Sequence, residues 1–131
     1  MLIMTAIQKP RKFKNENTER KKKLYNTQAW KNLSMIYKQE HPLCECCKID
    51  GKTSSVEEVH HLIKFDDQEN PEVRSMLLLD KDNLISLCKD CHQKYHKNQK
   101  ELSGLQRNLF HEKQLLVKRK YENKLIFLTI K

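Results

Sequence analysis

Residues 44–47 read CECC and residues 88–91 read CKDC, and these two stretches decide the fold. Each contains a C-x2-C pair, whose turn brings two sulfurs within about 4 Å, so each pair can hold one side of a tetrahedral zinc ion. Together they predict one structural zinc bound by four thiolates. The 40 residues between the pairs are more than a plain zinc ribbon contains, so we expect the metal to tie the base of an inserted unit.

The fifth cysteine, Cys46, leaves two interpretations of the first pair. Cys46 could replace Cys47 as a ligand in a C-x-C arrangement. We favour Cys44 and Cys47, together with Cys88 and Cys91, and treat Cys46 as a free thiol. A reducing cytoplasm keeps cysteines as thiols, which favours metal binding over disulfides.

The composition indicates one domain of ordinary size with a modest core. The chain has 131 residues, 33% charged and 37% hydrophobic, with 2 Gly and 3 Pro, which excludes collagen-like, linker-like and prion-like classes. No apolar run approaches the roughly 18 to 20 residues of a membrane span. The first residues, MLIMTAIQKPRKFK, place an apolar piece before the charges, the reverse of a secretory signal. We therefore expect a cytoplasmic protein with no membrane partner.

The net charge of +9 is concentrated in two basic arms around an acidic middle. Residues 1–30 hold eight basic and two acidic side chains, residues 31–93 eight and twelve, and residues 94–131 ten and three. Clusters of lysine and arginine suit a polyanion, because each neutralised phosphate releases counterions. Double-stranded DNA bound through the arms is the partner we expect; the alternative is that the arms are solvated surfaces that keep the protein soluble.

Local signals divide the chain into three parts: a basic arm over residues 1–24, a domain over 25–98, and a basic helix with a terminal strand over 99–131. The arm is either mobile or a frayed helix. In the domain we expect a helix capped by Asn26 or Thr27 and ended before Pro42, strands at 56–61 and 84–87, a helical turn from Pro71, and a helix at 91–98.

The last part opens with the capping-box pattern S-x-x-Q at Ser103 and Gln106. A basic helix follows to about residue 121, with Leu105, Leu109 and Leu116 expected on its packed face. Residues 125–130 then form the expected terminal strand.

Four histidines gather inside or just after the cysteine bracket. His60 and His61 are neighbours at a strand end, so their side chains point to opposite sides. His92 and His96 are spaced i, i+4 on one helix face, as two ligands of one metal would be. Asn83 precedes the second strand, where an amide can orient a histidine or pin a loop. Glu57 and Glu58 diverge as strand neighbours, so we assign them no catalytic role.

In this order the motifs resemble the HNH endonucleases, which have the ββα-metal or His-Me finger fold. The matching elements are C-x2-C at 44–47, VHHL at 59–62, DNL at 82–84 and LC-x2-CH-x3-H at 87–96. The segment LYNTQAWK at 24–31 and the PLC at 42–44 also resemble small phage and prophage members. Lys64 departs from the pattern, because many relatives carry proline there; Lys64 could instead face a phosphate.

The resemblance implies an α+β fold: a ββα-metal unit tied by a four-cysteine zinc knuckle and flanked by an N-terminal and a basic C-terminal helix. It implies that His61 is the general base, that His60, His92 and His96 hold one divalent ion, and that Asn83 holds the catalytic loop or orients His61. Three imidazoles favour Zn, Ni, Co or Mn, although two imidazoles with water and phosphate oxygens also suit Mg.

The activity implied is metal-dependent hydrolysis of DNA phosphodiester bonds, on a duplex lying across the surface and with weak sequence specificity. Phage relatives often accompany the DNA-packaging terminase, which implies a role in packaging or in processing host DNA. The alternative from a different class is a zinc module that binds nucleic acid or a protein without catalysis. His61 separates the two, because a binding module needs no base.

Overall fold

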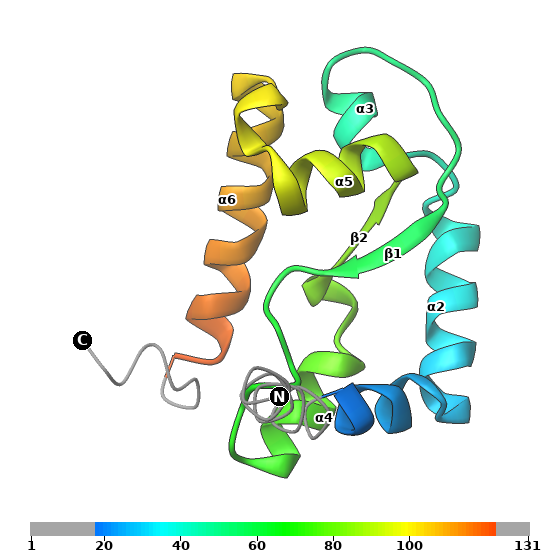
Figure 1. The fold of residues 1–131 in the computed structure, drawn as a ribbon, viewed down its shortest axis with the longest axis vertical. Helices are drawn as coiled ribbons and strands as arrows, with labels where there is room; N and C mark the ends of the chain where they lie inside the picture. Colours follow the sequence, from blue (N-terminus) through cyan, green and yellow to red (C-terminus); the bar gives the residue numbers. More distant parts are fainter. Residues whose placement is uncertain (1–17, 123–131) are drawn as a thin grey trace, which may run out of the picture.

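The computed structural model describes residues 18–122 as a mixed α+β fold around two short antiparallel strands (Figure 1). Strand β1 (Glu58–His61) pairs with β2 (Leu84–Leu87) in a register that sets His60 opposite Ile85. The helices are α2 (Gln28–Glu40), α3 (Glu45–Ile49), α4 (Pro71–Leu78), α5 (Lys89–Lys97) and α6 (Gly104–Lys120), with the short turns η1 (Lys81–Asn83) and η2 (Gln99–Glu101). This confirms the predicted α+β class.

The predicted arm and terminal strand fall partly or wholly outside these residues. The arm over 1–17 and the strand over 125–130 lie outside the described part of the chain. Residues 18–25 are helical, in agreement with the helical alternative for that end of the arm. None of the described helices is long and apolar enough to cross a membrane.

Local signals placed the two ends of α2 correctly. The Thr27 hydroxyl accepts a hydrogen bond from the Trp30 amide at 3.3 Å, so Thr27 is the cap. The helix ends at His41, because the residue before a proline is driven out of the helical region. Trp30 and Tyr37 are buried as core residues. Strand β1 begins at Glu58 and not at the predicted Val56. The Val56 amide donates its hydrogen bond to the carbonyl of Pro42 and so is not available to pair with β2.

The capping box of α6 is confirmed, but the expected packed face is wrong for two of its three leucines, since only Leu109 packs against the core. The Ser103 hydroxyl accepts from the Gln106 amide, and the Gln106 side chain accepts from the Ser103 amide, both at 3.0 Å. Leu105 and Leu116 are 58% and 63% exposed. The buried residues of this helix are Gln106, Phe110 and Val117.

The reason for that orientation is a polar anchor that hydrophobicity does not reveal. The side-chain Nε2 of Gln106 donates to the carbonyl of Cys46 at 2.9 Å, which turns this face of α6 toward the cysteine-rich turn. Phe110, one turn later, stacks on Tyr95 of α5 with centroids 4.4 Å apart. Leu105 and Leu116 are therefore left in solvent, whereas Leu109 is half-buried.

Side chains of β2 alternate between two apolar clusters, one on each side of the hairpin. Leu84 joins the cluster that contains Trp30 and Phe65. Ile85 and Leu87 join the cluster that contains the cysteines of the turn and of α5. In Figure 1 α2 and α6 flank the strands, so each cluster is closed by a helix. All four residues of β2 are buried, which explains why this strand is apolar apart from Ser86.

A carboxylate at the start of α3 joins four elements. Glu45 Oε2 accepts from the Ser86 amide at 2.8 Å and from the Tyr37 hydroxyl at 2.7 Å, and its Oε1 lies 3.1 Å from Lys113 Nζ. Burial alone would raise the pKa of Glu45, but the Ser86 and Tyr37 hydrogen bonds and Lys113 outweigh it and lower the pKa. The charged form is therefore the one that the fold stabilises.

We predict that Glu45→Gln lowers the free energy of unfolding by about 1.5 to 3 kcal/mol at pH 7, the usual contribution of hydrogen bonds to a charged group. Because the pKa of Glu45 is lower in the folded state, this stabilisation is present above the ordinary value of 4.5 and is lost as the pH falls through the folded value. Urea denaturation of both proteins from pH 7 to pH 3 should show the difference shrinking.

The control is Glu40→Gln, which removes an exposed ion pair with Lys81. We expect less than about 1 kcal/mol from it at any pH. A Glu45→Gln protein as stable as Glu40→Gln at pH 7 would show that the buried network contributes nothing.

Candidate functional site

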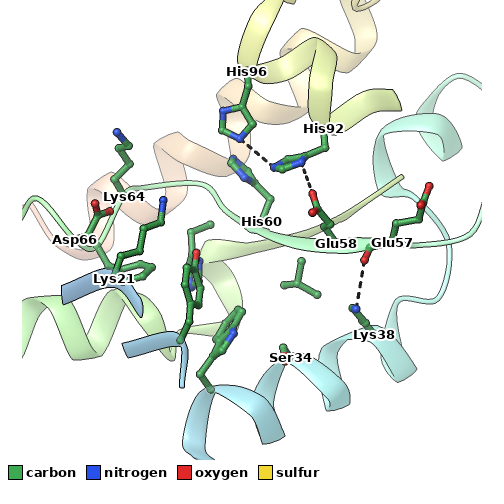
Figure 2. Close-up of a pocket in the computed structure, with 15 residues that line it drawn as sticks. Lys21, Ser34, Lys38, Glu57, Glu58, His60, Lys64, Asp66, His92 and His96 are labelled. Carbon is green, nitrogen blue, oxygen red and sulfur yellow. Dashed lines mark hydrogen bonds and ion pairs between the residues drawn. The ribbon is translucent and has the colours of Figure 1, made fainter. Parts of the chain in front are cut away.

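Three of the predicted ligands converge from two elements. His60 extends from β1, and His92 and His96 extend from α5, which packs across that strand (Figure 2). One ring nitrogen of each lies within 4.8 Å of the other two. His92 Nε2 and His96 Nε2 are 3.0 Å apart. Because bonds of about 2.0 to 2.1 Å to one ion bring nitrogens about 3 to 3.5 Å apart, the three imidazoles need little movement to hold a divalent cation.

Burial and neighbouring charges favour the metal-binding form of His60 and His96. Burial, followed by the charges of His96 and His92, lowers the pKa of His60 to about 3. The pKa of His96 is also lowered, first by burial and then by His92 and Lys21. Neutral imidazole is the ligand form of histidine, so the cluster is ready for a cation at neutral pH.

Glu58 is a site residue that our sequence interpretation missed. Its Oε2 forms an ion pair with His92 Nδ1, which leaves His92 Nε2 facing the other two histidines. Carboxylates in this position fix the ring and tautomer of a metal-binding histidine. A usable signal was present: Glu58 and His60 are two apart and share one face of β1. Glu57, on the other face, accepts from the Lys89 amide at 3.0 Å.

His61 lies on the side of β1 opposite His60, as the strand period predicts. Its ring is buried against Trp30, Phe65 and Tyr25, with centroids 4.7, 4.8 and 5.9 Å away. His61 Nε2 lies 3.0 Å from the carbonyl oxygen of Leu78. A carbonyl only accepts, so Nε2 carries the proton and Nδ1 is unprotonated, with the Tyr25 hydroxyl 3.4 Å away.

His61 lines the same cleft as His60, His92 and His96. A hollow of about 470 Å³ is lined by all four histidines. Burial is the main cause that lowers the pKa of His61 to about 4, so the ring is neutral at physiological pH. A neutral imidazole with an unprotonated nitrogen can take a proton from water.

Asn83 is fully buried and bonded to the loop that follows β1. Its Oδ1 accepts from the Ile63 amide at 2.8 Å, and its Nδ2 donates to the carbonyls of Ile63 and Leu77 at 3.0 Å each. No hydrogen bond joins the Asn83 and His61 side chains among the described residues. Of the two expected roles, these contacts support holding the loop; the link to His61 runs through Leu78, the neighbour of Leu77.

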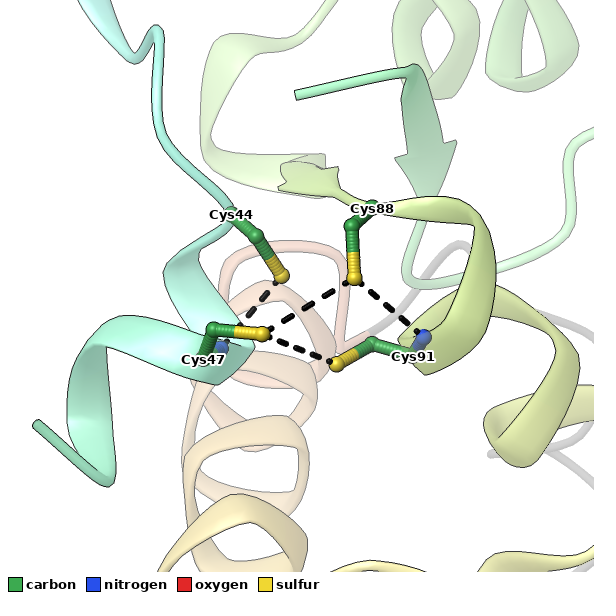
Figure 3. Close-up of side chains that lie close together, drawn as sticks. All are labelled: Cys44, Cys47, Cys88 and Cys91. Atoms are coloured by element: carbon green, nitrogen blue, oxygen red, sulfur yellow. Dashed lines mark hydrogen bonds between the residues drawn. The ribbon is translucent and has the colours of Figure 1, made fainter. Parts of the chain in front are cut away.

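The second predicted cluster is the four-cysteine group (Figure 3). The sulfurs of Cys44, Cys47, Cys88 and Cys91 all lie within 4.8 Å of one another. Cys47 Sγ is 3.8 Å from Cys88 Sγ and 3.5 Å from Cys91 Sγ. Four sulfurs at the usual Zn–S distance of about 2.3 Å lie about 3.8 Å apart, so the group fits a tetrahedral zinc.

Each cysteine pair forms the beginning of a helix. Cys44 caps α3 and Cys88 caps α5, and each sulfur accepts from the amide three residues later, at 3.3 and 3.5 Å. Burial raises the pKa of the Cys44 and Cys91 thiols, so thiolates at these two positions require a nearby cation. Cys46 is buried outside this group, which agrees with its treatment as a free thiol.

Comparison with known proteins agrees with this geometry. A family model of HNH endonucleases matches residues 44–98. Among solved structures, the chain is similar to the manganese-bound HNH endonuclease of the deep-sea thermophilic bacteriophage GVE2. The TM-score is 0.50 at 22% sequence identity, with 72% of this chain and 97% of that chain covered, a likeness of fold. A search of curated proteins finds no match. Residues 44–98 of this chain therefore match the HNH endonuclease family model and share the fold of a phage HNH endonuclease.

We predict that Cys88→Ser lowers bound zinc well below about one ion per chain and unfolds the domain, because a structural zinc site contributes directly to folding. Elemental analysis and circular dichroism measure the two effects. Cys46→Ala is the control: it removes a buried cysteine outside the group and should keep its zinc. A folded, zinc-loaded Cys88→Ser protein would contradict the four-thiolate site.

Proposed function

We propose that this protein is a metal-dependent endonuclease that hydrolyses DNA phosphodiester bonds. One observation carries the proposal: a neutral base, His61, and a three-imidazole metal cluster border the same cleft from opposite faces of one short strand. In this arrangement a water molecule can be deprotonated on one side while the phosphate is held on the other. A module that only binds DNA requires no such pairing.

In the reaction, His61 Nδ1 accepts a proton from water as the water oxygen forms a bond to phosphorus. The bond from phosphorus to the 3′ oxygen breaks, and that oxygen takes a proton from solvent, which gives 5′-phosphate and 3′-hydroxyl ends. The Leu78 carbonyl, bound to Nε2, favours the tautomer that the step requires and stabilises the imidazolium that forms. A divalent ion held by His60, His92 and His96 would neutralise charge on the pentavalent phosphate and the leaving oxygen.

The metal cluster favours some ions over others. Three imidazole donors suit Zn, Ni, Co or Mn, whereas two with water and phosphate oxygens would suffice for Mg. The manganese ion in the similar phage structure supports Mn as the first ion to test. Zinc is proposed at the four cysteines, where sulfur donors exclude Mg.

The biological setting proposed is a phage or its bacterial host. The similar structure comes from a bacteriophage nuclease, which supports a role in DNA packaging beside a terminase or in processing host DNA in the cytoplasm. The basic arms would hold the duplex through its phosphates. The domain boundaries at residues 25 and 98 stay predictions.

We predict that His61→Ala lowers cleavage of supercoiled plasmid at least about 100-fold, the low end for loss of a general base. The protein is stripped with chelator, its zinc is restored, and Mg, Mn, Ni, Co and Zn are added singly. Nicked and linear products are then counted separately.

The control is His41→Ala, an exposed histidine that stacks on Tyr37 outside the cleft. It should cleave within about twofold of wild type. Full cleavage by His61→Ala would rule out the base; no cleavage by folded wild type with any ion would favour the binding module.

We predict that Glu58→Gln weakens binding of the catalytic ion about 10- to 100-fold, as is usual when the partner of a metal-binding histidine is removed. Calorimetric titration of the zinc-loaded protein with Mn²⁺ measures it. Glu57→Gln is the matched control, because its amide oxygen can still accept from Lys89 and it does not contact His92. Equal Mn²⁺ affinity in the two variants would remove Glu58 from the site.

A further inference from the structure

The helix over residues 18–25 borders the proposed active site although it lies outside the residues that match the nuclease family. Lys21 and Tyr25, one helical turn apart, both line the cleft that contains the four histidines. Figure 2 shows Lys21 on this helix with its side chain in the region of the histidine cluster. None of the roles assigned above uses either residue.

Three contacts hold this helix against the cleft. Arg20 Nη1 donates to the carbonyl of Asp66 at 2.9 Å. The Tyr25 ring packs edge-on against Phe65, with centroids 5.3 Å apart and planes at 90°. The Tyr25 hydroxyl lies 3.4 Å from His61 Nδ1. Since these contacts join the helix to both the loop after β1 and the proposed base, Lys21 extends from a fixed platform.

Tyr25 is suited to holding that position over a wide pH range. Burial, followed by the charges of Asp66 and Glu58, raises the pKa of Tyr25 to about 12. The hydroxyl stays protonated and lies 3.4 Å from the unprotonated Nδ1 of His61, the atom that water must approach in the proposed reaction. The nucleophile therefore arrives directly beside the helix that carries Lys21.

The charges around the cleft make Lys21 available to an anion. The cations that line the cleft are Lys21, Lys38 and Lys64. Lys38 Nζ contacts the carbonyl of Glu57 at 3.4 Å. Within residues 18–122, neither Lys21 nor Lys64 takes part in an ion pair with a carboxylate. Lys21 also lies near enough to His60, His61 and His96 for its charge to lower the pKa of each, after burial in every case.

We propose that Lys21 is a substrate-contact residue, whose ammonium binds a non-bridging oxygen of the phosphate at or next to the bond that is cut. This rests on the proposed function, since it assigns a second contact to the same phosphate. A lysine there balances charge that grows on the phosphate oxygens in the transition state. The helix at 18–25 then completes the active site of a domain whose family-matched part begins only at residue 44.

The test compares Lys21→Gln, Lys21→Arg and Lys31→Gln in the full chain, loaded with zinc and with the ion that supports cleavage. Lys31 is the matched control, an exposed lysine on α2 that does not line the cleft. We expect Lys21→Gln to lower kcat/KM for a short duplex about 10- to 100-fold. Lys21→Arg should restore it to within about threefold, and Lys31→Gln should stay within about twofold of wild type.

Binding in chelator separates this proposal from the nuclease itself. Anisotropy of a labelled duplex is measured at several salt concentrations, where one lost phosphate contact lowers the salt slope by about 0.9. Only Lys21→Gln should show that decrease. If wild type fails to cut with every ion tested but Lys21→Gln still lowers the salt slope, the phosphate contact stands and the nuclease proposal fails. If wild type cuts and Lys21→Gln matches Lys31→Gln in rate and slope, the contact is overturned.

Discussion

The convergence of four sulfurs is the constraint on which the rest of this structure depends. Cys44 and Cys47 begin one short helix, and Cys88 and Cys91 begin α5. Joining the two helix starts fixes where α5 begins after β2 and the direction in which the helix runs. That direction places the rings of His92 and His96 against the ring of His60. The proposed zinc would therefore affect the histidine cluster indirectly, because it would fix the position of α5 and with it His92 and His96, two proposed ligands of the catalytic ion.

The two-residue period of a β-strand separates the two chemical tasks. Consecutive residues of β1 point to opposite sides, so His60 faces α5 while His61 faces the aromatic side chains of Tyr25, Trp30 and Phe65. The first environment brings nitrogen donors together, and the second buries most of the His61 ring and orients it through the Leu78 carbonyl. Burial keeps both rings neutral, the form needed by a metal ligand and by a base.

The site is also a product of segments far apart in the chain. Asn83 holds the loop after β1, and the Leu78 carbonyl contacts His61, the proposed base. Glu58 of β1 forms an ion pair with His92 of α5. The helix at 18–25 closes the other side through Arg20 and Tyr25. The cleft is open and borders on lysines, which suits a charged backbone lying across the surface more than an enclosed small molecule.

The sequence predicted the features that depend only on residues close together in the chain. Two C-x2-C pairs, a His-His dipeptide, histidines at i, i+4 and a capping box each state a geometry within a few residues, and all were found where expected. The buried face of α6, the pairing of Glu58 with His92 and the position of Tyr25 beside His61 were decided only by the tertiary structure. They depend on contacts between distant segments. In α6, the bond from Gln106 to the Cys46 carbonyl accompanies burial of a face that leaves Leu105 and Leu116 exposed, and no local period in the sequence predicts that.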